Sequence, residues 1–239
     1  MLKIRRPIPA GEVRLLIFDL DGTLVDSRVD LANSINAMLR HFGRPELPCE
    51  VIANYIGDGA PMLVRRSLGD PDDEQFVTGA IQFFLAWYRE HKLDNTYVYP
   101  GIFAALDRLC AAGGPPRKLA VLSNKPVNPS RIIVDALGLG KYFFQVYGGD
   151  SFHTKKPDPF GALQLAAEAG VRREQCAILG DSQNDVLTAH NAGMWSVGLR
   201  YGLAPQSLEI TPPDVLVDTP EEIALVFDPG GATDRIPLA

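Results

Sequence analysis

The chain has 239 residues, of which 46% are hydrophobic and 22% charged, and its formal net charge is −6. This balance predicts a globular protein with a buried core, and it excludes the large positive field that holds nucleic acid. The longest apolar runs fall far short of the roughly 20 residues that a membrane span needs, so no membrane partner is expected. Three isolated cysteines without a CxxC pair argue against disulfides and a thiolate zinc site, and indicate a cytoplasmic protein.

The predicted elements begin with an extension, residues 1–12, followed by a buried strand at 13–19. Between about residues 27 and 95 apolar residues recur at helical spacing, as in Leu31, Ile35 and Met38, which predicts an all-helical segment. The longest helix expected within it is QFVTGAIQFFLAWYREH, residues 75–91. Its FFLAWY stripe is expected to lie in the core of this segment or at a dimer surface.

From about residue 97 short apolar strands alternate with helices, which is typical of βαβ crossovers and a parallel sheet. Strands are expected at 118–124, 144–149, 176–181, 195–199 and 214–218, and helices at 127–138, at 159–170 and ending near 192. We therefore predict an α/β fold with a Rossmann-like parallel sheet core, formed by 13–26 and 96–239, and an inserted all-helical cap at 27–95. The Pro/Gly-rich tail after Phe227 is expected to be loosely held.

Asp19 and Asp21 stand two residues apart at the carboxyl end of the first strand, where open α/β sheets bind their ligands. Side chains two apart on an extended backbone share a side, so the carboxylates are expected to converge. A Mg²⁺ ion, which takes one or two carboxylates plus water and a phosphate, would explain the pair. A turn at Gly22 is the ordinary alternative. An EF-hand calcium loop is excluded, because its positions six and twelve would be Leu24 and Asp30.

Three later strand ends or loops carry matching chemistry. AVLSNKP supplies Ser123 and Asn124, whose hydroxyl and amide are suited to phosphate oxygens. HTKKPDP supplies two adjacent lysines that could neutralise a phosphate. AILGDSQNDV supplies Asp181 and, one helical turn later, Asp185, which would complete an acidic metal site. Taken singly, each stretch is also compatible with a turn, a helix cap or a solvated loop.

In chain order, DLDGT, LSN, KP and GDSQND resemble the four motifs of the haloacid dehalogenase (HAD) superfamily, from about residue 14 to 200. The helical insertion after LVDS resembles that family's cap. The chain is most similar to the phosphoglycolate phosphatase group, through DGTLVDS, YIGDGAPMLVRRSLG (55–69), VYPG, LSNKP and KKPDP. The resemblance implies a Mg²⁺-dependent phosphatase acting on a small phosphomonoester, and its narrower part implies 2-phosphoglycolate.

The resemblance also implies a role for each motif residue. Asp19 would attack phosphorus and form an aspartyl phosphate, and Asp21, oriented by Thr23, would protonate the leaving group and then activate water. The phosphoryl oxygens would be held by Ser123, Asn124 and Lys156, the last chosen over Lys155 because it directly precedes the proline. The metal would be held by the Asp19 carboxylate, the backbone carbonyl of Asp21, Asp181 and Asp185.

Several alternatives stay open at the level of sequence. A pyrophosphatase, a sugar-phosphate phosphatase and a β-phosphoglucomutase have the same core and cap type. An inactive scaffold and a phospho-acceptor signalling protein are the non-enzymatic alternatives. In the cap, Arg65 and Arg66 are candidates for binding a substrate carboxylate, and Gly57 to Gly59 for a hinge or a substrate contact. We expect a monomer or a homodimer.

Overall fold

The central element of the molecule is a seven-stranded sheet that is parallel except at one edge. The computed structural model describes residues 2–111 and 116–228. The strand order is β1 (Lys3–Ile4), β9 (Val215–Val217), β8 (Trp195–Leu199), β7 (Cys176–Gly180), β2 (Leu15–Phe18), β5 (Lys118–Leu122) and β6 (Gln145–Tyr147). The first predicted strand, β2, is therefore an interior strand of the sheet, with β7 and β5 on either side.

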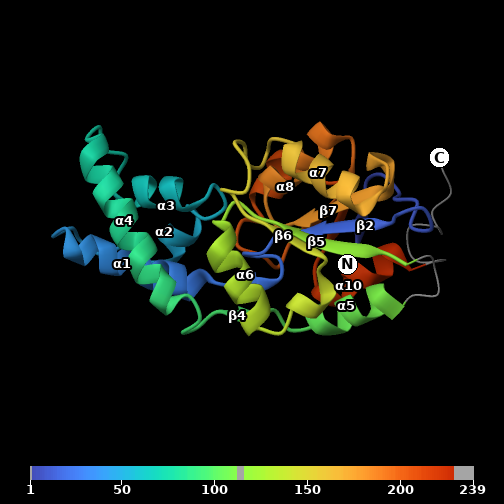
Figure 1. Cartoon of the computed structure of the whole chain (residues 1–239), viewed down its shortest axis with the longest axis horizontal. Coiled ribbons are helices and arrows are strands. Elements are labelled where there is room, and N and C mark those ends of the chain that lie inside the picture. Colours follow the sequence, from blue (N-terminus) through green and yellow to red (C-terminus); the bar gives the residue numbers. More distant parts are fainter. Residues whose placement is uncertain (1, 112–115, 229–239) are drawn as a thin grey trace.

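Helices cover both faces of the sheet (Figure 1). Along β2, Leu16 and Phe18 face one hydrophobic core, and Leu15 and Ile17 face the other. The first core includes α5 (Ile102–Ala111), α6 (Val127–Ala136) and α10 (Pro220–Phe227), and the second includes α7 (Phe160–Ala169) and α8 (Gln183–Ala192). The short elements α9 (Ser207–Ile210), η1 (Gly140–Tyr142) and η2 (Arg173–Gln175) complete this part. The predicted α/β fold is confirmed.

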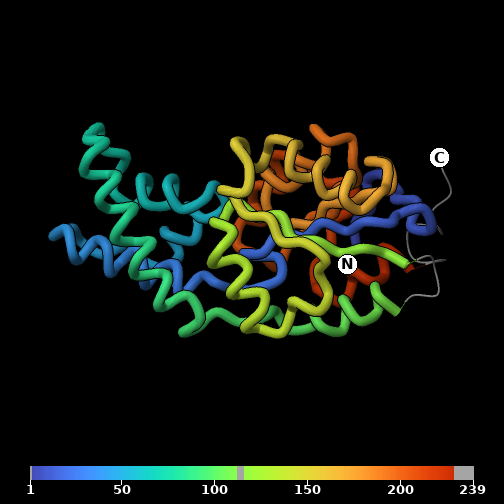
Figure 2. The backbone as a smooth tube through the Cα atoms, in the orientation of Figure 1, coloured from blue at the N-terminus to red at the C-terminus, as the bar shows by residue number. Residues whose placement is uncertain are grey.

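A helical lobe lies beside the sheet, between β2 and β5 in the sequence (Figure 2). It holds α1 (Arg28–His41), α2 (Cys49–Ala53), α3 (Ala60–Ser67) and α4 (Glu74–His91), packed around their own apolar core. The chain enters and leaves through a small antiparallel ribbon, β3 (Val25–Asp26) and β4 (Tyr97–Val98). That residues 27–95 form a domain of their own stays a prediction.

Asp30 clamps the two ends of this helical lobe together. Its buried carboxylate accepts hydrogen bonds from the backbone N–H groups of Asn95 and Thr96, at 2.9 and 2.8 Å, and from both of their side chains. A buried carboxylate needs such donors, because an unpaired charge away from water is costly. These hydrogen bonds therefore join the start of the helical lobe to its end, next to the sheet.

The N-terminal segment differs from expectation. Sequence analysis treats residues 1–12 as an extension, whereas Lys3 and Ile4 pair antiparallel with β9 and widen the sheet as β1. A two-residue strand has no periodicity from which it could be predicted. The tail predicted to be loosely held lies, beyond Asp228, outside the described residues. In the part of the chain that is described, no helix is long and apolar enough to cross a membrane.

Candidate active site

Three acidic side chains meet at the carboxyl ends of β2 and β7. Asp19 directly follows β2, Asp181 directly follows β7, and Asp185 lies in the first turn of α8. The two strands are paired in parallel, with Phe18 opposite Leu179, which brings their ends to one edge. The three side chains are buried, and one carboxylate oxygen from each lies within 4.8 Å of the others. Adjacent parallel strands thus assemble an acidic cluster from distant parts of the sequence.

Lys156 lies between two of these carboxylates. Its Nζ is 2.9 Å from Oδ1 of Asp19 and 2.6 Å from Oδ1 of Asp185. Burial alone would lower the pKa of Lys156, but the carboxylates of Asp185 and Asp19 outweigh it and raise that pKa above its ordinary value. The neighbouring Lys155 instead donates a hydrogen bond to the backbone oxygen of Asp58, at 2.6 Å. The lysine chosen from its position before proline is therefore the one that reaches the cluster.

Backbone and hydroxyl donors hold the other carboxylates in place. Asp185 Oδ2 accepts hydrogen bonds from the Ser182 N–H at 3.1 Å and from its hydroxyl at 2.7 Å. Asp181 Oδ2 accepts from the N–H groups of Leu203 and Ala204, at 2.6 and 3.1 Å. Ser182 is also the N-cap of α8. Helix capping, the ordinary alternative for this stretch, thus coexists with the cluster.

The cluster carries an excess of negative charge that a metal ion would remove. Three carboxylates meet one ammonium, that of Lys156, which leaves two negative charges if all are ionised. Burial raises the pKa of Asp19 to about 6. Burial, followed by repulsion from the other two acids, raises the pKa of Asp181 to about 8. Because hard divalent cations prefer carboxylate oxygens, these residues fit a divalent metal site.

The raised acid pKa values predict that EDTA-treated protein becomes less stable as the pH rises. Between the ordinary value of 3.8 and about 8, folded Asp181 keeps a proton that the unfolded chain releases, so the free energy of unfolding falls across this range. A divalent cation displaces that proton, so stabilisation by Mg²⁺ should grow from pH ~5 to pH ~8. Thermal melts with EDTA or Mg²⁺ measure both trends, and Asp181→Asn should flatten them. A metal-induced shift of the melting temperature that is equal at both pH values would contradict this prediction.

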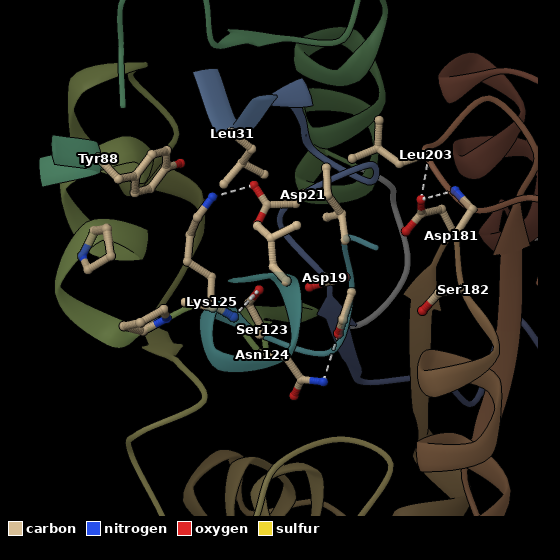
Figure 3. A pocket seen from close by; sticks show the side chains of 18 of the residues that line it. Asp19, Asp21, Leu31, Tyr88, Ser123, Asn124, Lys125, Asp181, Ser182 and Leu203 are labelled. Carbon is tan, nitrogen blue, oxygen red and sulfur yellow. Dashed lines mark hydrogen bonds and ion pairs between the residues drawn. The ribbon is translucent and has the colours of Figure 1, made fainter. Parts of the chain in front are cut away.

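Asp21 reaches a different group of partners from Asp19, although both line the same pocket. Its Oδ1 accepts from Lys125 Nζ at 2.6 Å and from the Ser27 hydroxyl at 2.5 Å; Figure 3 draws the Lys125 contact. The hydroxyl of Thr23, which was expected to orient Asp21, is buried without a hydrogen-bond partner among the described residues, and its role at the phosphate site stays a prediction. The chain turns at Gly22, with φ at 79°, so Thr23 does not continue the side of the strand that carries Asp21.

The two polar residues after β5 have different surroundings. Ser123 lines the pocket, and its Oγ accepts a hydrogen bond from the Lys125 N–H at 3.3 Å. The side-chain amide of Asn124 donates to the backbone oxygens of Gly57 and Lys156, at 2.9 and 3.0 Å. A buried amide has two N–H donors, and both are used. In this structure the amide joins the cap loop to the lysine loop, and its contact with phosphate stays a prediction.

The cap loop Gly57–Gly59 reaches the pocket, but the two candidate arginines do not. Asp58 of this loop forms an ion pair with Arg66 at 2.6 Å, and Arg65 pairs with Glu74 at 2.6 Å. Both guanidinium groups are thus paired within the cap, and neither is among the described residues that line the pocket. The expectation that they meet a substrate carboxylate is corrected, because acids of their own lobe neutralise them.

The pocket lies between the edge of the sheet and the cap, and Figure 3 shows lining side chains from both. The cap wall is mostly apolar and includes Leu31, Ile56, Leu63, Phe84 and Tyr88. Lys125 and Tyr88 are lining residues that were not predicted from the sequence. Lys125 directly follows the Ser-Asn pair in LSNKP, and that adjacency was an available signal. Tyr88 belongs to the FFLAWY stripe, where the sequence pattern does not distinguish residues that line the pocket from residues that only pack in the cap core.

Comparison with known proteins agrees with this fold and site. The family model described as haloacid dehalogenase-like hydrolase matches residues 16–199. The chain belongs to this family.

Its similar relatives include the phosphoglycolate phosphatase of Psychrobacter arcticus, which is 39% identical over 196 residues, 79% of this chain and 84% of the relative. Phosphoglycolate phosphatase 1 of Pseudomonas aeruginosa is 40% identical over 195 residues, 79% of this chain and 70% of the relative. The solved structure of a predicted phosphoglycolate phosphatase from Haemophilus somnus 129pt has a TM-score of 0.81 and 32% identity, and the match covers 89% of this chain and 96% of that one. The prediction of an enzyme, a hydrolase resembling the phosphoglycolate phosphatases, is confirmed.

Proposed function

We propose that this protein is a Mg²⁺-dependent phosphatase that hydrolyses 2-phosphoglycolate to glycolate and phosphate through an aspartyl phosphate. The observation that supports this most strongly is the junction of the acidic cluster with the pocket. Asp19 belongs to the cluster, contacts Lys156 at 2.9 Å, and also lines the pocket beside Asp21. One carboxylate is thus placed at once beside a metal site, a fixed cation and the space for a substrate.

In this proposal, Asp19 is the nucleophile and Asp21 the acid and base. Asp19 attacks phosphorus, and the phosphoryl group moves from the ester oxygen to its carboxylate. Asp21 gives a proton to the leaving alkoxide, then takes one from the water that hydrolyses the aspartyl phosphate. Ser27 and Lys125, which contact Asp21 Oδ1 at 2.5 and 2.6 Å, hold its carboxylate in the pocket for both transfers.

The other residues of the site stabilise charge. The Lys156 ammonium and the Ser123 hydroxyl are proposed to hold the phosphoryl oxygens as negative charge shifts to them. The metal is proposed to lie between the Asp19, Asp181 and Asp185 carboxylates with the backbone carbonyl of Asp21, and when bound it neutralises charge on the nucleophile and the phosphate. The apolar cap wall excludes water, which strengthens each of these contacts.

The proposal also covers the substrate, the cellular location and the oligomeric state. Two of the similar relatives are named phosphoglycolate phosphatases, and they support 2-phosphoglycolate over pyrophosphate or a sugar phosphate. The isolated cysteines support a cytoplasmic location. A monomer or a homodimer is proposed, with no nucleic-acid partner.

Phosphate release tests the proposal. Wild-type protein should hydrolyse 2-phosphoglycolate with a kcat/KM at least about tenfold above that for pyrophosphate or glucose 1-phosphate, because similar relatives are named phosphoglycolate phosphatases. EDTA should abolish release, and Mg²⁺ should restore it. Release that is unaffected by EDTA would contradict the metal-dependent mechanism. A preference for pyrophosphate or a sugar phosphate would replace the substrate, and absence of any release would favour the inactive scaffold.

A further inference from the structure

One positive charge lines the pocket and contacts the proposed acid, Asp21, rather than the acidic cluster. Of the described residues that line the pocket, Lys125 is the only basic one, whereas Lys156 contacts Asp19 and Asp185 and both cap arginines are paired within the cap. The Lys125 side chain is buried, with 5% of its surface exposed. Of its three N–H donors, one is directed to Asp21 at 2.6 Å, which leaves donors for an anionic group of the ligand.

The partners of Lys125 place this charge at the leaving-group end of the pocket. Its Nζ lies 2.6 Å from Asp21 Oδ1 and 4.9 Å from the centre of the Tyr88 ring on α4. The Tyr88 hydroxyl is buried and has no hydrogen-bond partner among the described residues. Figure 3 shows the tyrosine hydroxyl and the lysine ammonium on the same side of the pocket. An ammonium and an unpartnered hydroxyl therefore stand together beside the proposed acid.

We propose that Lys125 and the Tyr88 hydroxyl form the subsite that binds the carboxylate of the leaving group. This inference rests on the proposed function, in which Asp21 protonates the ester oxygen. In 2-phosphoglycolate a single methylene separates that oxygen from the carboxylate. A cation in contact with Asp21 is therefore within reach of the carboxylate, while the phosphoryl group lies against Asp19. Lys125 supplies the charge and Tyr88 a neutral donor, so the subsite selects short acids over uncharged alcohols.

A role limited to orienting Asp21 makes a different prediction. If Lys125 only positions that carboxylate, its loss slows every phosphomonoester by the same factor. If it binds the substrate carboxylate, its loss is selective for acids. The ratio of kcat/KM for 2-phosphoglycolate to that for 2-hydroxyethyl phosphate, in which an alcohol replaces the carboxylate, separates the two roles.

The experiment measures this ratio in wild type, Lys125→Met, Lys125→Arg, Tyr88→Phe and Arg65→Met, with Mg²⁺ present. Lys125→Met should lower the ratio by about 30-fold or more, and Tyr88→Phe by about fivefold, since a charged contact contributes more than a neutral hydrogen bond. Lys125→Arg should retain part of the preference because it keeps the charge. Arg65→Met, which removes a cap cation that is paired with Glu74, should keep the wild-type ratio. Competitive inhibition by glycolate should weaken in the same variants in which the kcat/KM ratio falls. Ethylene glycol, the uncharged counterpart of glycolate, is the control inhibitor.

Each outcome decides the inference. A wild-type preference for 2-phosphoglycolate that persists in Lys125→Met and Tyr88→Phe overturns the subsite and leaves the proposed function standing. A wild type that does not prefer 2-phosphoglycolate overturns the proposed substrate, and the carboxylate subsite with it. Thermal melts verify folding, and if Lys125→Met does not fold, Lys125→Arg and Tyr88→Phe decide the question.

Discussion

Replacing Asp19 with asparagine is expected to lower kcat by about 10⁴-fold or more with every phosphomonoester. The amide has nearly the shape of the carboxylate but no charge with which to attack phosphorus. Lys156 would keep its contact with Asp185, at 2.6 Å, so the fold should persist. Steady-state phosphate release from 2-phosphoglycolate and p-nitrophenyl phosphate, at saturating Mg²⁺, measures the loss.

The matched control for this variant is Asp72→Asn, which makes the same chemical change at an exposed position of the cap. Its turnover should stay within about twofold of wild type, as expected for a surface substitution. Acid quenching of wild type during turnover should trap a phosphorylated peptide containing Asp19, and the Asp19→Asn protein should yield none. Trapped phosphate on another residue, or turnover above about a hundredth of wild type in the variant, would assign the nucleophile elsewhere.

Replacing Lys156 with methionine is expected to cost about 3–5 kcal/mol of unfolding free energy in EDTA, because it leaves buried carboxylates without their cation. The ammonium contacts two of them, at 2.9 and 2.6 Å, and is itself only 3% exposed. Activity should fall as well, since the proposed phosphate contact is lost. Urea denaturation at neutral pH measures the stability, and phosphate release measures the activity.

A second substitution separates the two effects. Lys156→Met combined with Asp185→Asn removes one negative charge together with the positive one, so the double variant should be more stable than Lys156→Met alone. Activity should not return, because the phosphate contact is still missing. If the double variant is no more stable than the single one, lost packing rather than unpaired charge explains the cost of removing Lys156.

Most of the fold could be predicted because its strands and helices are strongly patterned. The helix expected at 75–91 is α4, Glu74–His91, and the strand expected at 195–199 is β8 with those bounds. Elements without a sequence pattern were not predicted. The ribbon of β3 and β4 and the edge strand β1 are each formed by two-residue strands, which exist only because a distant segment supplies the hydrogen bonds.

The site residues also fall into two groups: those that local sequence identifies and those whose contacts depend on distant segments. Which residues carry charge, and which strand end bears each of them, is a local property, so the sequence by itself identified Asp19, Asp181 and Asp185 as candidates that the structure brings together. The resemblance to the family favoured Lys156 over its neighbour, because the family's lysine directly precedes the proline, and Lys156 is the one that contacts Asp19.

Only the tertiary structure decided how the remaining side chains are used. A side-chain amide, a guanidinium or an ammonium bonds to whichever acceptor the packing of distant segments brings near it. Asn124 is therefore occupied by the cap loop, the cap arginines are neutralised by acids of their own lobe, and Lys125 faces Asp21 and Tyr88. The sequence by itself thus determined the chemistry available at the sheet edge. The pairing of these polar groups across cap and core depends on long-range contacts, which no local pattern encodes.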